Sequence, residues 1–447
     1  MKRAITQALK QWKNGLSRKP LILRGARQVG KTYSLLDFGK TYFPHYHYVN
    51  FEKDERARAL FDKDLHPVRI LEELQFYIDT SIDRQSDLLI FDEIQHCPKA
   101  LTSLKYFCEQ MPELALCAAG SLLGVYLADE SFPVGKVTLL DLFPMCFEEF
   151  LEALEKQSLV ELLRSHVIHQ PLPQAAHDRI WDMWKLYLIV GGLPEAVTRF
   201  RDQMDDQYKA VKGVREAQHD LLETCMADIA KHSGKINALH IERLWRNVTH
   251  QLAHSQDGSA AKFRFKDAVP GIRGYERLSS PMSWLEKARL ILRTSIVERA
   301  ETPLSGFIQE NRFKQYFFDV GLLGAFSGID PGRYLLYDFQ MYKGYVAENF
   351  VAQELCSSGI SALYCWSGRT AEVEFLLESA GGIIPVEVKA GRGTQSKSLK
   401  VYEERYKPKI SIVLSARNIQ SRGSRLHVPL YLAGRLQKYI EGYRIPL

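Results

Sequence analysis

The chain has 447 residues, and its 46% hydrophobic and 25% charged content is that of a soluble globular protein with well-buried cores. This length predicts two or three domains. The net charge of +6 is uneven: residues 390–447 hold twelve Lys or Arg against three Glu, so this region either binds a polyanion or forms a solvated surface.

Cysteine usage and apolar stretches argue against a secreted or membrane protein. The seven cysteines are odd in number and include no Cys-x-x-Cys pair, so neither a disulfide framework nor a zinc site is expected. The basic start, Met1–Ile5, lacks the apolar core of a signal peptide. The longest apolar stretch, residues 114–128, is too short to span a bilayer. We expect a cytoplasmic protein without a membrane partner.

A phosphate-binding loop follows an amphipathic helix expected over residues 1–18. An apolar run leads into Gly-x-x-x-x-Gly-Lys-Thr, and a helix is expected directly after it, which is the order of a P-loop. The glycines let an anion approach the backbone amides and the helix N-terminus. Lys31 is expected to reach the β- and γ-phosphates, and the Thr32 hydroxyl to ligate Mg²⁺. The residues predicted to bind ATP are Gly25, Ala26, Arg27, Gln28, Val29, Gly30, Lys31 and Thr32.

Residues 19–145 alternate apolar strands with helical stretches. This alternation predicts a parallel sheet with helices on both faces, an α/β fold of the P-loop NTPase type. The expected strands are 21–24, 46–51, 88–92, 114–119 and 137–142, and the clearest expected helices are 67–80 and 100–110.

Two carboxylates follow the buried strand 88–92. Asp92 and Glu93 would lie at the carboxyl edge of the sheet, where ligands bind in open α/β folds. Asp92 is predicted to orient Mg²⁺, and Glu93 to polarise the attacking water. Ser121, after the next apolar strand, either senses the γ-phosphate or belongs to a simple turn.

The sequence does not single out the positive charge that would stabilise the transition state. The candidates are Arg24, Arg27, Lys136 and Arg199. A residue supplied by a second copy of the chain would require oligomerisation.

Taken together, these motifs resemble a family of prokaryotic AAA-type ATPases that carry a C-terminal domain called DUF4143. The resemblance covers nearly the whole chain and implies an ATPase core with ATP and Mg²⁺ as cofactors. It includes the segment from Tyr187 to Glu195, which suggests a helical lid against that core. The motifs that carry it are residues 25–32, 91–95, 119–121, 131–137 and 147–151.

The middle of the chain is expected to be helical and then winged-helix-like. Helices are expected across residues 147–235, with a stop at the Gly-Gly-Leu-Pro turn. Strands at 290–293 and 316–319 follow further helices, as in a winged helix, which either binds DNA or serves as a protein scaffold. The predicted domains are 1–150, an ATPase core; 151–235, a lid; 236–335, a winged-helix-like domain; and 336–447, a nuclease-like domain.

The last predicted domain gathers acids and a lysine. Alternation along a strand puts Glu387 and Lys389 on one face, and Glu374 belongs to the preceding strand. Glu374 and Glu387 are predicted to hold Mg²⁺, Lys389 to orient water, and Glu348, from a helix, to complete the cluster.

This order of helix acid, strand acid and Glu-x-Lys resembles the core of PD-(D/E)xK nucleases, although the strand acid, usually Asp, is Glu374 here. The predicted catalytic residues are therefore Lys31 and Glu93 at the ATP site, and Glu348, Glu374, Glu387 and Lys389 in the nuclease-like domain. Three functions remain open: an ATP-hydrolysing switch acting on DNA, a regulatory scaffold that binds protein partners, and an ATP-gated, Mg²⁺-dependent nuclease.

Overall fold

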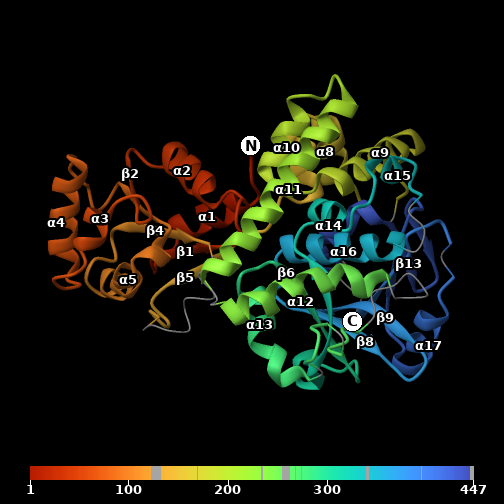
Figure 1. Ribbon diagram of the computed structural model, residues 1–447. Coiled ribbons are helices and arrows are strands. Elements are labelled where there is room, and N and C mark those ends of the chain that lie inside the picture. Colours follow the sequence, from red (N-terminus) through yellow and green to blue (C-terminus); the bar gives the residue numbers. More distant parts are fainter. Residues whose placement is uncertain are drawn as a thin grey trace. The chain divides into compact units, whose positions relative to one another are not determined.

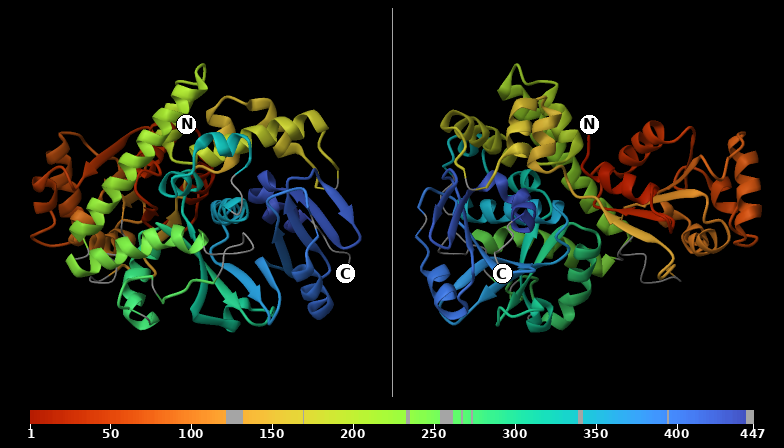
Figure 2. Two further views of the ribbon diagram at one scale, coloured as in Figure 1. Left: turned by 45° about the vertical axis from the view of Figure 1, so that its right-hand side comes forward. Right: turned by 180° about the vertical axis from the view of Figure 1, so that it is seen from behind.

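The computed structural model describes residues 1–121, 132–168, 170–232, 235–253, 262–266, 268–272, 274–338, 342–393 and 395–442. Its contacts divide the chain into two compact units (Figures 1 and 2). The N-terminal unit comprises Met1–Phe143 with Lys287–Arg289, and the C-terminal unit comprises Pro144–Glu286 with Leu290–Leu447. Part of the apolar stretch 114–128 and Ser131 of the motif 131–137 lie outside the described residues.

The N-terminal unit is built on a five-stranded parallel sheet in the order β2-β3-β4-β1-β5. Each predicted strand is confirmed, with bounds that agree within one residue at each end. The strands are β1 (Leu21–Arg24), β2 (Tyr46–Asn50), β3 (Leu88–Asp92), β4 (Ala115–Gly120) and β5 (Thr138–Asp141). The helices are α1 (Ile5–Lys13), α2 (Lys31–Tyr42), α3 (Glu55–Ala59), α4 (Pro67–Ile78), η1 (Ile94–His96) and α5 (Pro98–Gln110).

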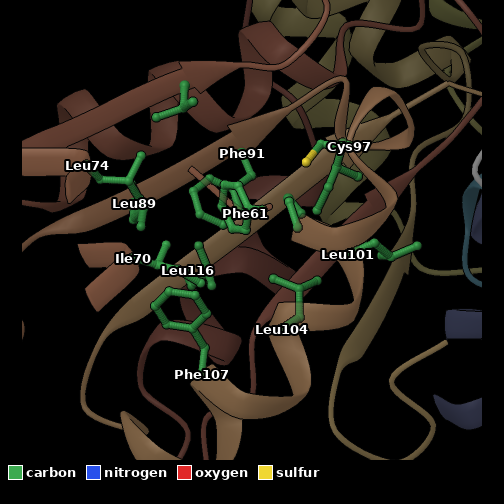
Figure 3. Close-up of a cluster of buried hydrophobic side chains, with 14 of the residues drawn as sticks. Phe61, Ile70, Leu74, Leu89, Phe91, Cys97, Leu101, Leu104, Phe107 and Leu116 are labelled. Atoms are coloured by element: carbon green, nitrogen blue, oxygen red, sulfur yellow. The ribbon is translucent and has the colours of Figure 1, made fainter. Parts of the chain in front are cut away.

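Helices cover both faces of this sheet. Alternate residues of β3, such as Leu89 and Phe91, pack with α4 and α5 in one hydrophobic cluster, which Figure 3 shows in close-up. On the other face α2 packs so closely that a Cβ added at Gly39 would lie 3.3 Å from the side chain of Leu88. Because the strands are parallel, their carboxyl ends share one edge, and the P-loop and Asp92 both lie there.

The C-terminal unit contains an eight-stranded mixed sheet in the order β12-β13-β11-β10-β9-β8-β6-β7. Its strands are β6 (Ile291–Val297), β7 (Ile308–Phe317), β8 (Leu363–Ser367), β9 (Glu372–Ser379), β10 (Gly382–Val388), β11 (Ser411–Ser415), β12 (Gln420–Arg422) and β13 (Arg425–Pro429). Its helices are α7 (Phe147–Ala153), α8 (Gln157–Ser165), α9 (Gln174–Val190), α10 (Pro194–Arg201), α11 (Gln207–His232), α12 (Lys235–Ala253), α13 (Tyr275–Lys287), η2 (Leu304–Phe307), α14 (Val320–Phe326), α15 (Pro331–Leu335), α16 (Tyr342–Ser357), α17 (Lys397–Tyr406), η3 (Leu430–Arg435) and α18 (Leu436–Gly442).

The middle of the chain differs from the predicted arrangement. The strands expected in a separate winged-helix-like domain, β6 and β7, form one edge of the eight-stranded sheet, because β6 pairs in parallel with β8. A boundary between residues 335 and 336 would therefore cut through a sheet. The helices expected as a lid on the ATPase core belong to the same compact unit as this sheet. There, His177 of α9 lies 2.7 Å from the hydroxyl oxygen of Tyr431.

Helix α16 packs on one face of the sheet, in contact with β7, β8 and β10 (Figure 1). Every residue from Tyr345 to Cys356 is buried, acids and amides included. The helix therefore belongs to the core of the C-terminal unit. Its buried polar side chains need hydrogen-bond partners within the protein. Among the residues that the structure describes, no helix is long and apolar enough to cross a membrane.

Candidate functional site

The P-loop has the backbone that its sequence predicts. Gly30, directly before α2, has φ of 93°, and Gln28 has φ of 59°, so two loop residues adopt the left-handed region. A Cβ added at Gly25 would lie 2.3 Å from the carbonyl oxygen of Leu142, so only glycine fits there. These constraints hold the loop open at the N-terminus of α2, where backbone amides and the helix dipole favour an anion.

Lys31 is buried and turned back onto its own loop. Its Nζ donates to the carbonyl oxygens of Gly25 at 3.0 Å and Ala26 at 2.8 Å. Burial lowers the pKa of Lys31 to about 8, although the nearby carboxylates of Glu93 and Asp92 oppose this shift. A phosphate at the loop would give the ammonium group a full negative partner and would raise this pKa again.

Asp92, the residue predicted to orient Mg²⁺, lies beside Thr32 of the P-loop. Its Oδ2 accepts hydrogen bonds from Thr32 Oγ1 at 2.9 Å and from the Tyr48 hydroxyl at 2.7 Å. Its Oδ1 is buried and has no hydrogen-bond partner among the residues that the structure describes. Burial raises the pKa of Asp92, with these two hydrogen bonds acting against the shift. A hydroxyl beside an incompletely satisfied carboxylate is a donor set that suits Mg²⁺.

Tyr48 is a site residue that sequence reasoning missed. It is held in turn by Asn50, whose Nδ2 donates to the Tyr48 hydroxyl at 3.0 Å. Burial, together with Asp92, raises the pKa of Tyr48 to about 12, so its hydroxyl keeps its proton and stays a donor. The available signal was that β2 ends in polar residues at the same sheet edge as the P-loop.

Glu93 has a constrained backbone and a held side chain. Its φ of 49° and ψ of 44° are left-handed, which for a non-glycine residue costs on the order of 1 kcal/mol. Its Oε2 accepts from Ser121 Oγ at 3.3 Å and from Gln95 Nε2. The structure thus brings Ser121, for which the sequence left two roles open, into contact with the predicted water-polarising residue.

Arg3, from the segment before α1, is a second residue that the sequence did not reveal. Its side chain is 8% exposed and reaches into the phosphate-binding region. Nη1 donates to the carbonyl oxygen of Val29 and Nη2 to that of Phe143, each at 2.7 Å. The guanidinium therefore links the P-loop to the chain segment that leaves β5.

Carboxylate partners are seen for three candidates for the transition-state charge. Arg24 pairs with Asp141 at 2.9 Å, Lys136 with Glu109 at 2.9 Å, and Arg199 with Glu195 at 2.8 Å. The fourth, Arg27, is close enough to Lys31 to lower the pKa of that lysine. Arg27 is the candidate that belongs to the P-loop itself.

The structure also brings together the acids predicted in the C-terminal unit. Glu348, Glu374 and Glu387 are 2%, 6% and 1% exposed. Glu374 Oε2 accepts from the amide of Val388 at 3.1 Å, and Lys389 Nζ lies 2.7 Å from Glu387 Oε1. Burial raises the pKa of Glu374 well above its usual value, and Glu387 and Glu348 add to that shift.

A buried lysine in β7 completes this group and was missed by sequence reasoning. Lys314 has no exposed surface; its Nζ pairs with Glu372 Oε1 and lies 3.8 Å from Glu348 Oε2. Burial alone would lower the pKa of Lys314, but Glu372 and Glu348 raise it well above the usual value. The available signal was that Lys314 lies in a strand end flanked by the aromatic residues Phe313 and Tyr316.

This cluster does not have the form of the predicted metal site. Across the described part of the chain, no group of three or more His, Cys, Asp or Glu side chains is placed to hold a metal ion. Glu387 Oε1 is already used by Ser396 Oγ, at 2.7 Å, and by Lys389. The positive charge among the acids comes from Lys314 and Lys389. The proposed ligands Glu374 and Glu387 therefore stay a prediction without geometric support.

Family comparisons agree with both ends of the chain. A family model described as an AAA domain matches residues 17–151. A model for a domain of unknown function, DUF4143, matches residues 343–432, as the sequence resemblance implied. A further model, DUF8612, also of unknown function, matches residues 182–333 and runs across the predicted boundary at 235. No curated protein matches the chain.

Solved structures give more distant similarities. The Walker-type ATPase of Pyrococcus abyssi is 16% identical, with a TM-score of 0.45, and the match covers 72% of this chain and 94% of that chain. The Aeropyrum pernix ORC1 protein, solved in complex with DNA, is 14% identical, with a TM-score of 0.29, covering 73% and 90%. DnaA of Aquifex aeolicus, bound to AMPPCP, is 12% identical, with a TM-score of 0.28, covering 64% and 87%.

Proposed function

We propose that this chain, which carries an AAA domain and a DUF4143 domain, is an ATP-hydrolysing switch that acts on DNA through its C-terminal unit. The observation that carries the proposal is the convergence of the P-loop, Asp92 and Glu93 at one edge of the parallel sheet. A P-loop alone implies phosphate binding, whereas a held carboxylate beside it implies attack by water.

Each residue has a distinct part in this proposal. Lys31 leaves the carbonyls of its own loop and binds the β- and γ-phosphates. Thr32 and Asp92 would hold Mg²⁺, which offsets charge on the phosphates when it is bound with ATP. Glu93, fixed by Ser121 and Gln95, accepts a hydrogen bond from water and takes its proton as the water attacks.

Glu93→Gln tests the proposed division between binding and hydrolysis. The amide keeps the size of the side chain but cannot take a proton, so hydrolysis should fall by about 100-fold or more while ATP affinity changes little. Nucleotide binding is measured with a fluorescent ATP analogue and turnover by phosphate release. Glu109→Gln, at a surface ion pair, is the matched control. Unchanged turnover in Glu93→Gln would remove Glu93 from the mechanism.

The lowered pKa of Lys31 predicts a pH-dependent affinity for ATP. Without nucleotide the ammonium loses its proton as the pH rises through about 8. Bound phosphates favour the charged form, so binding takes up a proton and affinity falls with rising pH. We expect about tenfold weaker binding at pH 9 than at pH 7 at fixed ionic strength. An affinity that is constant over this range would show that Lys31 is fully charged in the free protein.

DNA is proposed as partner because of the charge on the C-terminal unit. Around α17, six basic side chains are exposed, and Glu403 and Glu387 face Arg425 and Lys389. The exposed residues are Arg392, Lys397, Lys400, Arg405, Lys407 and Lys409. The exposed carboxylate of Glu404 lies 3.8 Å from one of the six, Lys400. Such a surface would bind a phosphate backbone by releasing counterions.

Replacing the three lysines Lys397, Lys400 and Lys407 by Gln tests this surface. DNA affinity should fall, and the slope of log affinity against log salt should decrease by about three, roughly one for each lysine that no longer neutralises a phosphate. Gln replacement of three exposed lysines elsewhere, Lys2, Lys10 and Lys53, is the matched control. DNA affinity that is independent of salt and of these changes would favour a protein partner instead.

A further inference from the structure

Residues 142–147, which we call the coupling segment, connect the two units covalently. The N-terminal unit ends at Phe143, and the C-terminal unit begins at Pro144. Hydrogen bonds hold the segment on each side of this junction. Within the N-terminal unit the segment contacts residues around the P-loop, and within the C-terminal unit it contacts α9 and α16.

On the N-terminal side, the coupling segment is tied to the start and the end of the P-loop. The amide of Leu142 donates to the carbonyl oxygen of Arg24 at 2.7 Å, directly before the loop. Arg3 joins the carbonyl oxygens of Val29 and Phe143 with its two terminal nitrogens. Two charge-assisted hydrogen bonds from one planar guanidinium fix the distance between these two carbonyl groups more tightly than a single donor would.

On the C-terminal side, the segment is locked against the end of α9. The amide of Met145 donates to the carbonyl oxygen of Gly192 at 2.6 Å, and the Tyr187 hydroxyl donates to the Met145 carbonyl oxygen. A Cβ added at Gly192 would lie 2.1 Å from that oxygen. Gly192 is itself held by Asp319, whose Oδ2 accepts from its amide at 2.7 Å. Packing this close leaves the segment no freedom to shift alone.

The last contact reaches α16. The amide of Phe147, at the start of α7, donates to Glu354 Oε1 at 2.8 Å. Glu354 is 3% exposed, and a Cβ added at Gly434 would lie 2.5 Å from its Oε2. Almost two turns earlier, the same helix presents Glu348 to Lys314 and Tyr316. A displacement of the coupling segment would thus act on the helix that carries Glu348, one member of the carboxylate cluster.

We propose that Arg3 and Glu354 are positioning residues through which occupancy of the P-loop changes the C-terminal unit. The inference rests on the proposed function, because it requires ATP to bind. When Lys31 leaves the carbonyls of Gly25 and Ala26, the loop loses two internal hydrogen bonds and adjusts to the phosphates. Arg3 passes that adjustment from Val29 to Phe143, and Glu354 receives it at Phe147.

Hydrogen–deuterium exchange with and without ATP, alongside ATP binding, tests the proposal on the full chain. In the wild-type protein, ATP should change amide exchange in α7 and α16 by about fivefold, the lower end of typical coupling between sites. Glu354→Met, which removes the acceptor, should bind ATP normally and lose the change in α16. Glu354→Gln keeps an acceptor for the Phe147 amide and should retain the ATP-dependent change in exchange in α16.

Arg3 provides the second pair of variants, should Glu354→Met fail to fold. Arg3→Met should lose the exchange response of α7 and α16, and Arg3→Lys, with a single donor group, should keep only part of it; Lys2→Ala, at an exposed neighbour, is the control. A full ATP response in Glu354→Met or in Arg3→Met would overturn the proposal. Failure of the wild-type chain to bind ATP would instead overturn the proposed function, and this inference with it.

Discussion

Lys31→Ala should abolish ATP binding, with a loss of affinity of about 100-fold or more, equivalent to about 2.7 kcal/mol. The lysine is the first residue of α2, and its buried ammonium group lies beside the carbonyl oxygens of the P-loop. Its removal takes away the charge that would face the β- and γ-phosphates. Titration with a fluorescent ATP analogue measures the effect.

Lys136→Ala is the matched control for this change. Lys136 belongs to the same unit, is partly exposed and pairs with Glu109 at the surface, so its loss should leave ATP affinity within about twofold. Turnover retained by Lys31→Ala would contradict the assignment of residues 25–32 as the nucleotide site.

Lys314→Met should destabilise the C-terminal unit by about 3–5 kcal/mol, the usual cost of breaking a buried ion pair from one side. Methionine fills a similar volume, so the loss would come from charge and not from a cavity. Glu348 and Glu372 would then face each other without the ammonium between them. Chemical denaturation, with the two units followed separately by hydrogen exchange, measures the change.

Two further variants separate charge from packing at Lys314. Lys400→Met, at an exposed residue 3.8 Å from Glu404, should change stability by less than about 1 kcal/mol. Adding Glu348→Gln to Lys314→Met should recover part of the loss, because one unpaired charge is then removed. A Lys314→Met protein as stable as the wild type would show that the cluster does not need this internal cation.

The sequence was sufficient to place the P-loop and the two carboxylates at one edge of the parallel sheet, because these signals are local. Gly25–Thr32 and Asp92-Glu93 each follow an apolar strand, and parallel strands bring their carboxyl ends to one edge without further information. Glu348, Glu374 and Glu387 are all buried in the C-terminal unit, but their predicted role in holding a metal ion stays a prediction.

Tertiary contacts decided the remaining features. Arg3, Tyr48 and Lys314 act through partners distant in sequence, and the local pattern around each of them does not reveal those partners. The predicted winged helix differs from the structure for a related reason. Strand β6 pairs with β8, which lies far from it in the sequence, and the local sequence pattern does not predict which distant strands pair. Likewise, a helical pattern alone could not show that α9 packs with the C-terminal sheet.

Phosphate release from ATP by the purified full chain decides whether the P-loop site hydrolyses nucleotide. We expect steady release with Mg²⁺ that stops when the ion is chelated, since Thr32 and Asp92 are the proposed ligands of this ion. Glu93→Gln should bind the nucleotide and release almost no phosphate. A wild-type chain that binds ATP and Mg²⁺ but releases no phosphate would rule out the proposed hydrolysis and leave a site that only binds nucleotide.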